Sequence, residues 1–136
     1  MKALSFSPDG RLFLSCQGNC CPHIYPRDGG KTRAPLQTGV MGDKYIRDMH
    51  KTRGHTGMLT FGQWNPSENN LFMTSSIDGT VRLWDLTSKT TGIDHQLAHS
   101  NVIVIKNSEG LRCSATTCSY SPGAERICVG AEDGSL

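Results

Sequence analysis

The chain has 136 residues, a formal net charge of +2 and 36% hydrophobic residues. Its length fits one ordinary domain, and a charge this small excludes a chain-wide basic surface of the kind that binds nucleic acid or membrane. No apolar run approaches the roughly 20 residues of a membrane-spanning helix, and the N-terminus lacks the apolar core of a signal peptide. We therefore expect a soluble, intracellular protein with no membrane partner.

The first part of the chain begins within an apolar strand that ends at the turn of residues 8–10. Farther along, Pro22 and Pro26 flank the place where a third strand should lie. Because proline has no backbone N–H to donate to a neighbouring strand, we expect that strand to be short or at the edge of a sheet. The residues between Gly30 and Val40 are typical of a loop.

The next segment, residues 42–53, predicts a loop with a local positive charge, opposed only by Asp43 and Asp48. Tyrosine and arginine are favoured at binding hot spots, so this loop is the best candidate for a partner contact. Its candidate partner-binding residues are Lys44, Tyr45, Arg47, His50, Lys51 and Arg53. The alternative is a solvated loop that Ile46 and Met49 hold against the core.

Residues 54–85 carry the clearest pattern in the chain. The alternation that starts at Met58 predicts a strand to Trp64, and the following Asn-Pro-Ser ends it. Residues 71–76 and 80–84 predict two further strands rich in β-formers. Between them Asp78-Gly79 is a hairpin signal, and we expect a primed turn with both residues at positive φ.

The remainder of the chain repeats parts of this pattern. Residues 102–105 predict another strand, residues 119–122 repeat the strand end at residues 5–8, and residues 133–135 repeat the Asp-Gly turn. Strands and turns recur throughout and no sustained helical period is present, so we expect an all-β fold.

The Gly-His pair at residues 54–55, the Asp78 turn and the closing Trp84 make this segment resemble the WD-repeat family, whose repeats form propeller blades. The resemblance implies a structural tetrad of His55, Thr74, Asp78 and Trp84, joined by hydrogen bonds. Buried aspartate and histidine are unfavourable unless they are paired, so we expect these four to hold the blade together. The alternative is a catalytic Asp-His-Thr relay, and no oxyanion or substrate motif accompanies it.

The family resemblance also suggests how the chain divides. The prolines that follow the repeated strands, Pro8, Pro66 and Pro122, are 58 and then 56 residues apart. That spacing exceeds the about 40 to 45 residues usual for a WD repeat, so each unit should carry extra loop. We expect an incomplete, degenerate first blade at residues 1–41, a basic inter-blade loop at 42–53, a complete blade with its outer strand at 54–107, and the truncated start of a third at 108–136.

These two to three four-stranded antiparallel blades would form a partial propeller that is not closed, since closure takes about four to eight blades. We therefore expect the chain to be part of a longer protein, whose remaining blades would be among its partners.

The loop before the complete repeat makes the chain similar to one group within the family. Residues 42–55, the Met58-Leu59 pair and residues 62–66 look like the gastrulation-defective group (WD repeat-containing protein 70 type), and the similarity covers nearly the whole chain. The resemblance implies a nuclear protein linked to the DNA-damage response, acting as a substrate-receptor-like adaptor for a cullin-type ubiquitin ligase. Thr87 stands where some ligase-docking members carry an arginine.

Six cysteines and five histidines raise the alternative of a metal site. Four soft ligands lie close together at Cys16, Cys20, Cys21 and His23, but they lack a Cys-x-x-Cys knuckle and a second half-site. His95 and His99 would share a face only if they lay on a helix, whereas their surroundings favour a loop that leads into a strand. We expect free thiols and no metal.

Two functional classes follow. The first is a non-catalytic scaffold or adaptor that presents loops of the propeller face to other proteins in a nuclear complex. The second is a nucleic-acid-associated factor of RNA processing or chromatin, whose basic loop contacts phosphates. The sequence has neither a Gly-rich phosphate loop nor carboxylates paired in a recognisable setting, so we expect no enzyme and no cofactor.

Overall fold

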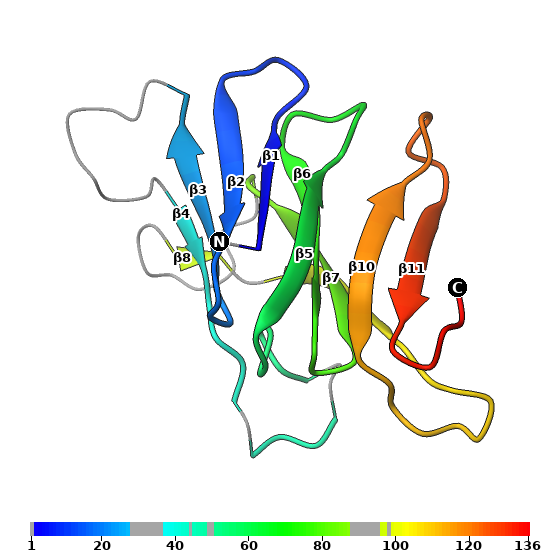
Figure 1. Ribbon diagram of the computed structural model, residues 1–136. Helices are drawn as coiled ribbons and strands as arrows, with labels where there is room; N and C mark the ends of the chain where they lie inside the picture. The colour runs from blue at the N-terminus through cyan, green and yellow to red at the C-terminus, as the bar shows by residue number, and fades with distance from the viewer. Residues whose placement is uncertain (1, 28–36, 44, 49–50, 88–95, 98) are drawn as a thin grey trace.

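The computed structural model of the chain describes residues 2–27, 37–43, 45–48, 51–87, 96–97 and 99–136 (Figure 1). Every regular element in these ranges is a strand, as expected for the all-β class, and none of them contains a helix that could cross a membrane. The strands are β1 (Ala3–Phe6), β2 (Leu12–Cys16), β3 (Pro22–Pro26), β4 (Gln37–Gly39), β5 (Leu59–Trp64), β6 (Leu71–Ser76), β7 (Thr80–Asp85), β8 (Gln96–Leu97), β9 (His99–Val104), β10 (Ala115–Tyr120) and β11 (Ile127–Ala131).

The strands form three sheets that stand side by side (Figure 1). Their strand orders are β1-β2-β3-β4-β8, β5-β6-β7-β9 and β10-β11, and every pairing is antiparallel except that of β4 with β8. β5 packs against β1 and β2 on one side and against β10 on the other. This is the open, partial propeller that the sequence predicts. The parallel pairing of β8 with the first sheet is not anticipated, because two residues give no strand pattern.

Two expectations about the first sheet are wrong. β3 is not an edge strand, since β2 and β4 pair with its two sides. Its prolines are its two end residues, and β4 pairs only with His23 and Ile24, so neither proline interrupts that pairing. The stretch between Gly30 and Val40 is not all loop, because β4 lies within it.

The Asp78 turn also differs from the expected primed form. The loop between β6 and β7 has three residues, and the N–H of Gly79 donates to the carbonyl of Ser76 at 3.3 Å. Gly79 has a φ of 81°, and Asp78 is not among the residues with positive φ. A three-residue hairpin needs the left-handed conformation only at its last position, which is why glycine is required there and not at Asp78.

The core consists of two layers, each between adjacent sheets. Neighbouring residues on a strand point to opposite faces, so Phe72 and Met73 in β6 enter different layers. The layer between the first two sheets contains Leu14, Cys16, Ile24, Leu59, Trp64, Phe72 and Trp84. The layer between the second and third contains Met73, Val81, Ala115 and Cys118. The central sheet is therefore buried on both faces.

Candidate functional site

A continuous hydrogen-bond network of buried side chains joins two strands of the central sheet. His55 lies just before β5, Thr74 in β6, Asp78 in the turn and Trp84 in β7. His55 Nε2 lies 2.7 Å from Thr74 Oγ1, and His55 Nδ1 lies 3.1 Å from Asp78 Oδ2. The Trp84 indole Nε1–H donates to Thr74 Oγ1 at 2.9 Å. The network thus links β6, β7 and the turn between them to the segment that leads into β5.

The protonation states give this network one direction of donation. Burial lowers the pKa of His55 more than the nearby Asp78 raises it, so the imidazole is neutral at physiological pH. Burial alone would raise the pKa of Asp78, but hydrogen bonds from His55, Thr80 and the Thr56 N–H keep it below the usual range. With a neutral ring, Trp84 donates to Thr74, Thr74 donates to Nε2, and Nδ1–H donates to the carboxylate.

This geometry suits a structural role rather than a catalytic one. The side chains of His55 and Asp78 are 0% and 3% exposed, so no substrate reaches them. Thr80 occupies the second carboxylate oxygen, to which its hydroxyl donates at 2.6 Å. The Asp-His-Thr group is therefore closed to solvent, and its polar atoms bond to one another and to Thr80.

Residues 42–53 form a loop whose two ends are tied together. The N–H of Gly42 donates to the carbonyl of His55 at 2.8 Å. A Cβ on Gly42 would collide with the carbonyl of Gly54, and a Cβ on Gly54 would collide with that of Val40. Only glycine lets these two backbone segments approach so closely. The loop therefore leaves and re-enters the fold at one point.

Within the loop, local turns expose the candidate contact residues. The N–H of Tyr45 donates to the Asp43 side chain at 2.9 Å, and the N–H of Lys51 donates to the Asp48 carbonyl at 3.0 Å. The Tyr45 side chain is 95% exposed. Arg47, Lys51 and Arg53 are also exposed, whereas Lys44, His50 and Met49 lie outside the described residues. Ile46 is half-buried and belongs to neither core layer.

Two residues that attach the loop to the central sheet, Arg82 and Thr52, were not predicted from the sequence. Arg82 in β7 is fully buried, and its guanidinium donates to both the carbonyl and the hydroxyl of Thr52. A signal was present, because Arg82 stands two residues before Trp84 and so shares its buried face. The partner could not be inferred, since Thr52 lies 30 positions earlier in a loop.

The loop lies at one end of the sheets, and two further segments lie at the same end. We call it the turn face, made of the described residues within 42–58, 77–79 and 105–114. Backbone and side-chain contacts join its parts: Ile77 N–H donates to Met58 at 3.1 Å, and the Ser114 hydroxyl donates to Ile77 at 3.0 Å. Met58, Ile77 and Leu111 are exposed apolar residues on this face. The Asp78 turn lies at the same end of the sheets as the loop (Figure 1).

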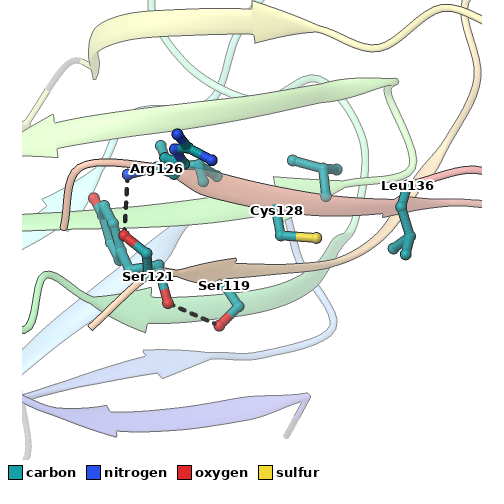
Figure 2. Close-up of a pocket in the computed structure, with 8 residues that line it drawn as sticks. Ser119, Ser121, Arg126, Cys128 and Leu136 are labelled. Atoms are coloured by element: carbon teal, nitrogen blue, oxygen red, sulfur yellow. Dashed lines mark hydrogen bonds between the residues drawn. The ribbon is translucent and has the colours of Figure 1, made fainter. Parts of the chain in front are cut away.

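A hollow of about 410 Å³ lies on β10 and β11. Figure 2 shows Ser119, Ser121, Arg126, Cys128 and Leu136 at its wall. The Ser119 hydroxyl donates to the Tyr120 carbonyl, and the Arg126 N–H donates to Ser121 Oγ at 3.1 Å. Because these polar groups are used between neighbours, the hollow offers no convergent set for a ligand.

Two of the four candidate metal ligands near the start of the chain, Cys16 and His23, are engaged elsewhere. Cys16 is buried in the core, and burial raises its pKa to about 12. The ring of His23 lies 3.2 Å from Thr38 Oγ1 and 3.3 Å from Asn19 Nδ2. Among the described residues no group of three or more suitable side chains could hold a metal, and the six cysteines, all of them described, form no disulfide. His99 lies in β9, whereas its surroundings favour a loop at this position, and His95 is outside the described residues.

Comparisons with known proteins show what the chain is similar to. A family model described as WD domain, G-beta repeat matches residues 46–85. The whole chain is 38% identical to WD repeat-containing protein 70 of Xenopus tropicalis and 32% identical to that of Homo sapiens. It is 35% identical to the gastrulation defective protein 1 homolog of Drosophila melanogaster. The chain spans 20%, 19% and 19% of the length of these relatives, respectively.

Proposed function

We propose, from the premise that the chain belongs to the WD40-repeat family, that it is part of a propeller which brings other proteins together through its turn face. One observation carries this proposal. The 42–53 loop is closed at its base and anchored from below, yet its Tyr45 side chain is 95% exposed. A loop that is held in place while it displays an aromatic side chain and arginine is suited to a hot-spot contact.

The network of His55, Thr74, Asp78 and Trp84 serves this function indirectly. It fixes the turn and the entry to β5, which are the two neighbours of the loop on the turn face. We propose that these four residues hold the blade together and make no contact with a partner. The exposed Met58 and Ile77 beside them would extend the contact area with apolar surface.

The finer assignment follows from the similarity to the gastrulation-defective group. We propose a nuclear complex with a ubiquitin-ligase or DNA-damage-response link. Thr87 is exposed, and its N–H and hydroxyl both donate to the Asp85 side chain, at 2.9 and 2.6 Å. Since a short threonine cannot replace the bidentate reach of an arginine, ligase docking would use another part of the protein.

A second candidate is contact with nucleic-acid phosphates. The exposed side chains of Arg47, Lys51 and Arg53 favour it. The exposed Asp43 and Asp48 in the same loop oppose it, because they would repel a phosphate backbone. We therefore place it second to protein binding.

The test compares two charge reversals in the full-length protein. Arg47→Glu changes the loop, and Arg11→Glu changes an exposed arginine in the β1–β2 connection, at the opposite end of the sheets (Figure 1). After nuclease treatment, quantitative affinity purification should show partners lost by Arg47→Glu and kept by Arg11→Glu. Equal recovery by both variants would contradict the proposal. Losses that nuclease treatment alone reproduces would favour the nucleic-acid candidate.

A further inference from the structure

We infer that Arg82 and Thr52 form a buried clamp that sets how the 42–53 loop presents its contact residues, which makes Arg82 a positioning residue for the proposed function. Arg82 lies in the central sheet and Thr52 in the loop, 30 positions apart in the chain. Their contact joins β7, the strand that contains Trp84, to the C-terminal part of the loop.

The clamp has the geometry of a fork. One terminal nitrogen of Arg82 donates to the Thr52 carbonyl at 3.2 Å, and the other donates to the Thr52 hydroxyl. Arg82 is 0% exposed and Thr52 is 2% exposed, so water does not compete for either bond. A planar guanidinium presents its donors in a fixed spacing, which a lysine ammonium cannot reproduce.

The surrounding charges explain why a cation is retained in the core. A buried charge is unfavourable unless an opposite charge and hydrogen bonds compensate it. The charge of the Asp78 carboxylate raises the pKa of Arg82, and the charge of Arg82 lowers the pKa of His55. Burial nevertheless lowers the pKa of Arg82 overall. The clamp is therefore coupled to the tetrad and does not act as an isolated contact.

The position of Thr52 decides what the clamp controls. Its neighbours Lys51 and Arg53 are both exposed, so the buried threonine fixes the direction of two candidate contact residues. The other arm of the loop is fixed separately by the bond from Gly42 to His55. Loss of the clamp should release the C-terminal part of the loop around Thr52 and leave its N-terminal end at Gly42 in place.

Two substitutions of Thr52 form a matched pair. Thr52→Val removes the hydroxyl and keeps the shape, whereas Thr52→Ser keeps the hydroxyl. Arg82→Lys keeps the charge and loses the fork. The readout is the rate at which trypsin cleaves the native full-length protein after Arg47, Lys51 and Arg53, with cleavage after the exposed Arg11 as the internal reference.

We expect Thr52→Val and Arg82→Lys to raise cleavage after Lys51 and Arg53 about tenfold, since loss of a bond to a charged donor increases the open population that trypsin cuts. Thr52→Ser should cleave like the wild type, and cleavage after Arg11 should not change. Partner recovery should fall in the same two variants. Unchanged loop cleavage in both variants would overturn the inference, and so would an equal rise at Arg11, which reports general unfolding.

The same data separate this inference from the function on which it rests. If Arg47→Glu leaves every partner in place, the proposed function fails, whatever the cleavage rates are. If Arg47→Glu removes a partner while Thr52→Val cleaves like the wild type, the function stands and the clamp fails.

Discussion

At the scale of single residues, the central blade depends on hydrogen bonds that run in one direction through buried groups. Thr74 is the middle of this series, because its hydroxyl both accepts from Trp84 and donates to His55. A hydroxyl at this place satisfies two buried partners at once. The same carboxylate arrangement recurs without a histidine at Asp133, where the Ser135 N–H and hydroxyl donate at 2.9 and 2.6 Å.

Thr74→Val should therefore be strongly destabilising for its size. The substitution leaves the Trp84 N–H and a nitrogen of His55 buried without this partner, and each such loss costs about 1 to 3 kcal/mol. Equilibrium unfolding of the full-length protein in denaturant measures the change. Ser67→Ala, which removes a hydroxyl at an exposed position of the β5–β6 connection, is the control and should stay within about 0.5 kcal/mol. Equal effects of the two substitutions would show that the network contributes little.

The neutral state of His55 makes a second prediction, about pH. Its pKa is lowered in the folded protein, so below pH 6.5, the ordinary value, the unfolded chain binds a proton that the folded chain does not. The folded state therefore loses stability as the pH falls through this range. Asp78 adds a further loss only in strong acid, because its lowered pKa stabilises the fold at every pH above 3.8.

The measurement compares melting temperatures of the wild type and His55→Gln from pH 7.5 to 5.5. Glutamine can donate and accept but does not titrate, so the advantage of the wild type should shrink as the pH falls. An advantage that grows toward acid would mean that His55 is protonated and ion-paired with Asp78.

The sequence allows some of these residues to be named, for a physical reason. His55, Asp78 and Trp84 belong to a local motif whose spacing is set by strand and turn lengths, so a pattern can identify them. Arg82 and Thr52 are in contact only because the 42–53 loop, 30 positions earlier in the chain, packs against β7. No local spacing encodes that contact.

At the scale of elements, strand positions follow from alternation and turn residues, and their partners do not. The predicted strands at residues 71–76 and 80–84 agree with β6 and β7. The errors concern pairing: the prolines of β3 were expected to keep neighbours away, but β4 pairs only with the central part of that strand. Pairing depends on segments that are distant in the chain, such as β4 and β8.

The two glycines at the base of the loop give a prediction at this scale. Gly54→Ala places a methyl group against the carbonyl of Val40, so one backbone segment must move and the loop ends must separate. Crowding of this kind typically costs about 1 to 3 kcal/mol. Gly18→Ala is the matched control, because nothing lies within 4 Å of its Cβ position. A melting temperature that falls no further for Gly54→Ala than for Gly18→Ala would disprove the close approach.

At the scale of the whole molecule, the outer faces of the assembly are open. On the first sheet, the ring centroids of Phe6 and Phe13 lie 5.8 Å apart, and the ring of Phe13 stacks on that of Tyr25 with 5.3 Å between centroids. Phe6 is half exposed. At the other side, the hollow on β10 and β11 leaves part of an apolar surface uncovered (Figure 2). Propellers normally cover such faces with the neighbouring blades.

A polypeptide limited to these 136 residues should therefore self-associate or remain partly unfolded. Size-exclusion chromatography with light scattering measures its mass in solution. The expected result is a mass that rises with concentration. A compact monomer at all concentrations would show that the two open faces are tolerated in water.

We propose that the turn face contacts protein partners through the 42–53 loop. The most direct measurement replaces Tyr45 by a photo-crosslinking amino acid in the full-length protein, with the same probe at Arg11 as the control at the opposite end. We expect the probe at position 45 to form light-dependent adducts with another protein, and we expect the probe at position 11 to form none of these adducts. The adducts from position 45 should be lost when Arg47→Glu is added. The absence of protein adducts at position 45, or identical adducts from both positions, would contradict this proposal.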